Sequence, residues 1–110
     1  MDIEKRGMVT IIKTDERLDA IVAPQFKDTV KKMAEESVLH LVVDLAKTRF
    51  IDSSGCGALV ASIRALLKNG GEMKIARPSA QAKTLFELTR LHRVFEIFDD
   101  LDRAVNSFSA

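Results

Sequence analysis

The residues with the clearest chemical potential lie in one short stretch, Asp52-Ser53-Ser54-Gly55-Cys56-Gly57. It supplies hydroxyl groups, a carboxylate and a thiol, and it leads directly into an apolar pattern with helical spacing. The first N–H groups of a helix lack backbone partners and carry partial positive charge, so they favour an anion. The stretch could therefore bind a phosphate group or receive one covalently on a serine.

Non-covalent phosphate binding is the weaker of these two interpretations. The stretch has neither the lysine of a P-loop nor the glycine spacing of a dinucleotide fingerprint. Asp52 would also repel a free nucleotide phosphate. Covalent modification of a serine is therefore the stronger hypothesis for phosphate chemistry at this point.

A serine nucleophile is a further hypothesis, which the sequence disfavours. A nucleophile elbow requires glycine two residues before the serine, whereas isoleucine and aspartate stand at that spacing here. The candidate bases are His40, inside an apolar run, and His92, in a surface-like Arg-Leu-His-Arg segment. We therefore reject hydrolysis and expect no catalytic residue.

A purely structural interpretation also accounts for the stretch. Ser53 or Ser54 can cap the helix, and Gly55 and Gly57 can allow close packing. Cys56 fits a small core-facing position better than a reactive thiol, although a helix N-terminus can lower a thiol pKa. The residues alone leave this interpretation open beside phosphorylation, and they do not distinguish Ser53 from Ser54 as an acceptor.

A buried strand and an amphipathic helix must position these groups. The apolar, β-branched run 39–45 predicts a strand that is covered on both faces. The helix that follows is expected to end at Asn69-Gly70-Gly71. Its inward face is assigned to Cys56, Leu59, Val60, Ile63, Leu66 and Leu67, with Ser62, Arg64 and Lys68 on the other faces.

The rest of the chain predicts β-α units after an initial hairpin. Strands are expected at 3–6 and 8–13, with a half-exposed face at 9–11, then a loop over 14–20 and further strands at 72–76 and 94–98. Helices are expected after Pro24, after Pro78-Ser79 and after a capping Asp99. The inward stripe of the first helix is Phe26, Val30, Met33 and Ala34. The sum is an α/β fold whose mixed sheet has about five strands with about four α-helices.

Composition limits the remaining classes of function. A chain of 110 residues with 46% hydrophobic content predicts one folded domain over residues 1–110. A net charge of +1 gives no field that would gather nucleic acid or anionic lipid. There is no run long enough to cross a membrane, no leader before Met8, and no cysteine and histidine spacing typical of a metal site. We expect a cytoplasmic protein that binds no cofactor or metal and has no direct contact with nucleic acid or membrane.

Several segments together resemble the STAS domain of bacterial anti-sigma-factor antagonists. They are Val43-Asp44-Leu45, then Phe50-Ile51-Asp52-Ser53-Ser54-Gly55, the apolar helix and Gly70-Gly71-Glu72. The likeness extends to Arg17-Leu18-Asp19, to Ala76-Arg77-Pro78 and to Leu91-His92-Arg93-Val94-Phe95. It thus covers nearly the whole chain, and it implies a single STAS domain.

The resemblance implies a switch protein that is a substrate and not an enzyme. In the family a kinase-type anti-sigma factor phosphorylates the serine directly after the aspartate, which is Ser53 here. The unphosphorylated form binds the anti-sigma factor and frees the sigma factor, and a metal-dependent serine phosphatase restores that form. The partner surface that the resemblance implies comprises Asp19, Asp52, Ser54, Gly55, Cys56 and Gly57. We expect the protein to be a monomer.

Two positions depart from the family pattern. Before the Leu-Asp pair of the first loop, family members often carry glycine, whereas this chain has Arg17, preceded by Glu16. At the position of Cys56, family members usually carry a larger apolar residue. The alternative function is that of a STAS binding subunit without phospho-switching, in a lipid-transport complex or a ligand sensor. The intact acceptor Ser53 argues against that alternative.

Overall fold

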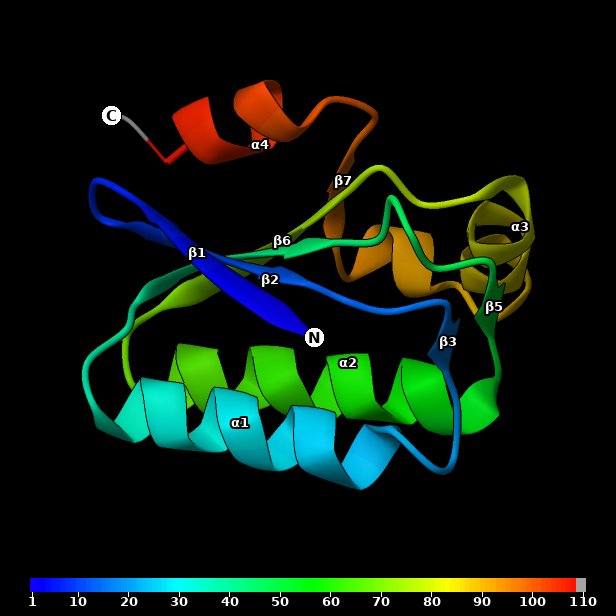
Figure 1. Ribbon diagram of the computed structural model, residues 1–110, viewed down its shortest axis with the longest axis horizontal. Helices are drawn as coiled ribbons and strands as arrows, with labels where there is room; N and C mark the ends of the chain where they lie inside the picture. Colours follow the sequence, from blue (N-terminus) through cyan, green and yellow to red (C-terminus); the bar gives the residue numbers. More distant parts are fainter. Residues whose placement is uncertain (109–110) are drawn as a thin grey trace.

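The computed structural model describes residues 1–108, which form a central sheet with helices on both faces (Figure 1). These residues contain four α-helices, a 3₁₀ helix and seven strands. In chain order the elements are β1 (Asp2–Arg6), β2 (Val9–Lys13), β3 (Arg17–Leu18), α1 (Ala23–Glu35), β4 (His40–Asp44), β5 (Phe50–Ile51), α2 (Ser53–Lys68), β6 (Glu72–Ala76), α3 (Ala80–Leu88), η1 (Leu91–Arg93), β7 (Glu96–Phe98) and α4 (Leu101–Asn106).

The main sheet has five strands in the order β1-β2-β4-β6-β7. β1 is antiparallel to β2, and all other neighbours are parallel. This mixed α/β sheet confirms the predicted fold class. The parallel strands β2 and β4 are followed along the chain by the short strands β3 and β5. These two short strands pair with each other in a second, two-stranded sheet. The sequence analysis did not predict this second sheet.

Helices α1 and α2 pack side by side on one face of the main sheet, and α4 lies on the other (Figure 1). The strands between them alternate their side chains between two cores. Leu41 and Val43 of β4 belong to the core under α1 and α2, whereas Val42 belongs to the core under α4. The predicted burial of this strand on both faces is therefore confirmed.

Strand β2 corrects one expectation of the sequence analysis. Val9, Thr10, Ile11 and Ile12 are all buried, so the predicted half-exposed face is wrong. Ile11 lies in the core under α4, which comes from the far end of the chain. Alternation within a short segment cannot reveal that a distant helix covers its second face.

The helices agree with the predicted stripes, with local exceptions. α1 buries Phe26, Val30 and Ala34, with Met33 partly buried. In α2 two assignments were wrong: Leu67 is 59% exposed, and Ser62 is buried with its hydroxyl donating to the Ala58 carbonyl at 2.7 Å. That intrahelical hydrogen bond satisfies the hydroxyl group, so Ser62 can face the core.

Two of the predicted helix ends are confirmed, and one predicted cap is wrong. Gly70 has a φ of +82°, the left-handed conformation that ends α2 as predicted. Ser79 caps α3 as predicted, through the Ala82 N–H. The closing helix is capped by Asp100 and not by Asp99, because the Asp100 carboxylate accepts the Asp102 and Arg103 N–H groups. Among residues 1–108, no helix is both long enough and apolar enough to span a membrane.

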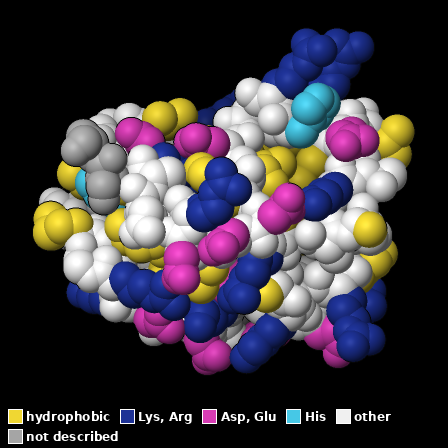
Figure 2. Space-filling view, turned by 90° about the horizontal axis from the view of Figure 1, so that it is seen from above, with side chains coloured by type: hydrophobic (Ala, Val, Ile, Leu, Met, Phe, Trp, Pro, Cys, Tyr) yellow, Lys and Arg dark blue, Asp and Glu magenta, His cyan; other side chains and the backbone are white. Residues whose placement is uncertain are grey.

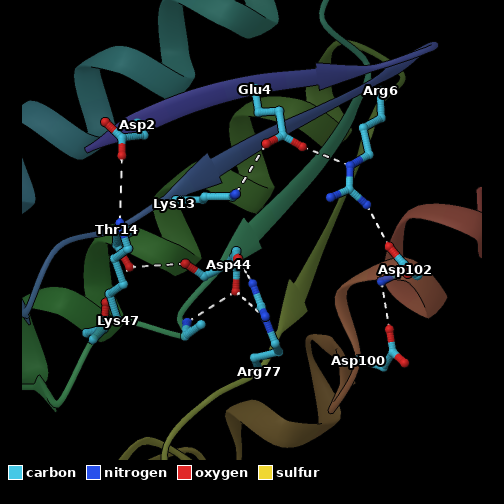
Figure 3. Close-up of polar contacts among 12 residues, drawn as sticks. Asp2, Glu4, Arg6, Lys13, Thr14, Asp44, Lys47, Arg77, Asp100 and Asp102 are labelled. Carbon is cyan, nitrogen blue, oxygen red and sulfur yellow. Dashed lines mark hydrogen bonds and ion pairs between the residues drawn. The ribbon is translucent and has the colours of Figure 1, made fainter.

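The outer surface on the side of the molecule where α4 lies carries acidic and basic side chains next to one another (Figure 2). Arg6 of β1 pairs with Asp102 of α4 at 2.7 Å, and Lys83 of α3 pairs with Asp99 at 2.8 Å. Figure 3 shows the Arg6 contact together with the pairing of Glu4 to Arg6 and Lys13. The first pair joins α4 to β1, and the second joins the loop before α4 to α3.

Candidate functional site

The start of α2 is set by Asp52. Its backbone is extended, with φ −107° and ψ −174°, and its carboxylate accepts the Gly55 N–H at 2.9 Å. Ser53 and Ser54 are therefore the first two residues of the helix. The prediction that one of the serines caps the helix was wrong, because Asp52 fills that position.

Both serines face solvent in the first turn of α2. Within residues 1–108, the backbone N–H groups of Ser53 and Ser54 have no hydrogen-bond acceptor. These groups and the helix dipole make the turn favourable for a negative charge, while the Asp52 carboxylate opposes one. An added phosphate would thus meet a favourable backbone and an unfavourable neighbour.

The loop before α1 passes directly over this turn. β3 pairs with β5 in parallel, with Leu18 opposite Ile51, and the Asp52 N–H donates to the Leu18 carbonyl at 3.4 Å. A Cβ on Gly55 would lie 2.1 Å from that carbonyl oxygen. Gly55 is therefore required by close packing of the loop on α2, as the structural interpretation of this glycine proposed.

Asp19 follows immediately in the same loop. Its carboxylate accepts the backbone N–H groups of Ile21 and Val22, at 3.1 and 3.4 Å, and so fixes the entry to α1. The Arg17 guanidinium pairs with it at 3.1 Å and also stacks on the Phe50 ring. The hydrogen bond from Arg17 holds the pKa of Asp19 below its usual value. Arg17 is thus accommodated by two specific contacts.

The other residues of the stretch divide into buried and exposed groups. Gly55 and Cys56 are buried, and Gly57 is exposed with open space around it. Burial raises the pKa of the Cys56 thiol, and the nearby Asp52 carboxylate raises it further. Cys56 is therefore a core-facing residue with no sign of an activated thiol.

An ion pair behind the site joins two loops that lead toward it. Asp44, at the end of β4, is 1% exposed and pairs through both carboxylate oxygens with Arg77, which follows β6 (Figure 3). Asp44 also accepts the Ala46 N–H at 3.1 Å. The pairing ties the loop after β4, which leads to β5, to the loop that precedes α3.

Gln81 of α3 is a residue that the sequence analysis missed. Its side-chain amide hydrogen-bonds both the N–H and the carbonyl of Ile51, immediately before Asp52. The two residues are 30 positions apart. An exposed glutamine on a helix gives no sequence signal of such a contact.

Neither histidine contacts the serines within residues 1–108. His40 stacks on Phe108 at the opposite end of β4, with ring centroids 4.9 Å apart. His92 lies in η1 with its Nδ1 3.3 Å from the Phe86 carbonyl oxygen. The same part of the chain contains no cluster of side chains that could hold a metal ion.

The fold and the site together define a class: a small α/β domain that presents two exposed serines at a helix start, with a loop packed against the next residue, Gly55. A family model described as the STAS domain matches residues 1–104. The chain belongs to the STAS domain family, as its residues led us to predict.

The relatives include anti-sigma factor antagonists. The anti-sigma-B factor antagonist of Staphylococcus aureus is 27% identical over 86 residues, covering 78% of this chain and 80% of that protein. A Thermotoga maritima protein assigned as an anti-sigma factor antagonist superposes with a TM-score of 0.91 and 21% identity, covering 96% and 92% of the two chains.

SpoIIAA has a similar fold in two chemical states. The unphosphorylated anti-sigma factor antagonist gives a TM-score of 0.75 at 17% identity, covering 96% of this chain and 94% of SpoIIAA. The phosphorylated form, from Bacillus, gives 0.77 at 18% identity and covers 97% of each chain. At these identities the structural likeness establishes the fold.

Proposed function

We propose that this protein is an anti-sigma-factor antagonist that is switched by phosphorylation of Ser53. The observation that carries the proposal is the exposed hydroxyl of Ser53 at the first position of α2, directly after the capping Asp52. Proteins of similar sequence or fold are named as anti-sigma factor antagonists, and one of them is known in a phosphorylated form. Ser53 also stands directly after an aspartate, which is the acceptor position that the family resemblance implies.

The switch is electrostatic. A phosphoserine adds about −1.5 to −2 charges at neutral pH. The free N–H groups of the first turn accommodate that charge within the domain, so the fold persists. Against a docked partner, the phosphate adds to the Asp52 and Asp19 carboxylates and is costly to desolvate. Affinity for the partner therefore falls without unfolding.

The proposed partner surface is the exposed part of the same helix start. Asp19, Asp52, Ser54 and Gly57 lie on it or at its border. Gly55 and Cys56 are buried beneath it, so they contribute by packing and not by touching the partner. Of the predicted partner-binding residues, four thus remain in the proposed surface, and Gly55 and Cys56 support it from below.

The chemistry belongs to the partners. A kinase-type anti-sigma factor binds ATP and transfers the γ-phosphate of ATP to the Ser53 hydroxyl, releasing ADP, and a metal-dependent serine phosphatase hydrolyses the phosphoserine. The domain itself is a substrate and acts as a monomer in the cytoplasm, where sigma factors function. A STAS subunit without phospho-switching remains the alternative, but no feature of the site favours it.

The test is direct modification. The purified protein is incubated with ATP and the kinase-type anti-sigma factor encoded in the same genome, and phosphate is located by mass spectrometry. We expect one phosphate on Ser53 in the wild type, none in Ser53→Ala, and a single phosphate that is still on Ser53 in Ser54→Ala. No uptake by the wild type, from a kinase that modifies another antagonist, would contradict the proposal. Phosphate found on Ser54 would show that Ser54, and not Ser53, is the acceptor.

A further inference from the structure

Strand β5, which leads into the proposed acceptor, is bound on its open edge by a side chain. The Ile51 N–H donates to Gln81 Oε1 at 3.0 Å, and Gln81 Nε2 donates to the Ile51 carbonyl at 2.8 Å. A side-chain carboxamide presents an oxygen acceptor beside an N–H donor, so one glutamine can satisfy both backbone groups of Ile51. Gln81 therefore pairs with Ile51 as a neighbouring strand would.

The opposite edge of β5 is occupied by the chain around β3. The Phe50 N–H donates to the Glu16 carbonyl at 3.3 Å, and the Asp52 N–H donates to the Leu18 carbonyl at 3.4 Å. Successive residues of a strand direct their N–H groups to opposite edges. Gln81 thus completes the pairing of a strand that is otherwise bonded on one side.

This pairing matters because the small sheet is weak on its own. β3 and β5 have two residues each, and the bonds that flank their pairing, from the Phe50 N–H to Glu16 and from the Asp52 N–H to Leu18, are long at 3.3 and 3.4 Å. Two-stranded sheets are marginal without further packing. The Ile51 backbone lies one residue before the cap and two before Ser53, so a shift of β5 moves the hydroxyl directly.

Gln81 is held by a rigid support. It lies in the first turn of α3, whose cap is Ser79 and whose inward residues Ala82 and Phe86 are fully buried. The side chain therefore connects a packed helix to the segment that carries the acceptor. A group that is fixed by packing positions its partner more accurately than a loop does.

Resting on the proposed function, we infer that Gln81 is a positioning residue for phosphorylation of Ser53. It holds β5 so that α2 begins at a fixed point and the Ser53 hydroxyl meets the kinase in a productive orientation. A small displacement of a reacting group lowers turnover more than it lowers binding. We therefore expect loss of the Gln81 side chain to lower kcat for phosphorylation and to leave KM little changed.

The variants isolate the two hydrogen bonds. Gln81→Ala removes both, and Gln81→Glu keeps the size and the acceptor but loses the donor to the Ile51 carbonyl at neutral pH. Glu87→Ala is the matched control: Glu87 is exposed on the same helix and makes no side-chain hydrogen bond within residues 1–108. The global stability of each variant is measured by urea unfolding.

The first measurement is amide hydrogen exchange by NMR and needs no partner. We expect the Ile51 N–H to exchange about tenfold faster or more in Gln81→Ala, while the Val42 N–H in β4 changes only as global stability does. Gln81→Glu should fall between Gln81→Ala and the wild type, and Glu87→Ala should match the wild type. Unchanged protection of Ile51 in Gln81→Ala would overturn the inference.

The second measurement is steady-state phosphorylation by the kinase-type anti-sigma factor. We expect kcat to fall about tenfold in Gln81→Ala, less in Gln81→Glu and not in Glu87→Ala, with KM within about twofold throughout. Faster exchange at Ile51 with an unchanged kcat would overturn the positioning role. A loss of rate that only tracks the unfolded fraction would overturn it equally. If the wild type takes up no phosphate, the proposed function fails, whereas the exchange measurement still reports whether Gln81 holds β5.

Discussion

The Asp52 carboxylate accepts the Gly55 N–H at 2.9 Å, and this contact sets the first residue of α2. It leaves the hydroxyl of Ser53 free of any capping role. It also places a carboxylate directly beside the proposed acceptor. In the proposed switch, the residue that starts the helix therefore also adds to the repulsion between an added phosphate and a partner.

Replacing Asp52 tests its capping role. Asp52→Ala removes the acceptor for the Gly55 N–H, and we expect the free energy of unfolding to fall by about 0.5–2 kcal/mol. Asp52→Asn keeps an oxygen acceptor and should lose far less. Urea unfolding of the three proteins measures both values. Equal losses in the two variants would show that the charge, and not the cap, is what stabilises α2.

The two glycines of the helix start should respond in opposite directions to alanine. In Gly55→Ala the new Cβ would lie 2.1 Å from the Leu18 carbonyl oxygen, so the loop must move and stability should fall by about 1–3 kcal/mol. In Gly57→Ala the new Cβ meets open space, and the better helix former should add about 0.5–1 kcal/mol. Thermal unfolding of both variants checks this contrast. A loss at Gly57 similar to that at Gly55 would contradict the packing argument.

Much of the fold could be predicted because its signals are local. The β-branched run of β4, the stripe of α1 and the glycine that ends α2 are each specified within a few residues. β3 could not be predicted, because a strand of two residues, Arg17 and Leu18, shows no alternation. The burial of Ile11 also required knowledge of α4, a helix about 90 residues further along the chain.

The candidate site was predictable in place but not in detail. Residue types located the helix start, yet aspartate and serine are both preferred caps, so the sequence could not assign that role to Asp52. The burial of Gly55 depends on the Leu18 carbonyl, and the pairing of Ile51 depends on Gln81. Both contacts join segments far apart in the sequence, and neither has a local pattern.

The charge at position 53 should control partner binding. Ser53→Asp places a carboxylate where the phosphate would stand, and we expect its affinity for the anti-sigma factor to fall at least about tenfold, or about 1.4 kcal/mol. Ser53→Ala should bind as the wild type does. Isothermal titration calorimetry measures both, and Ser54→Asp is the control for charge at the next position. Equal affinity of the two Ser53 variants would refute the electrostatic switch.

Asp19 should make the stability of the loop depend on pH. Its pKa is lowered in the folded protein, mainly by the hydrogen bond from Arg17, so the folded state binds its proton less readily than the unfolded state does. The stabilisation is therefore fully present above the unfolded pKa of about 3.9 and is lost as the pH falls through the lower folded value. Asp19→Asn keeps an oxygen for the Ile21 and Val22 N–H groups but loses the ion pair. We expect the variant to be less stable than the wild type near neutral pH and the difference to shrink as the pH falls below about 4. Urea unfolding of both proteins across this range measures the difference, and a gap that stays constant or widens in acid would show that Arg17 does not stabilise the charged form of Asp19.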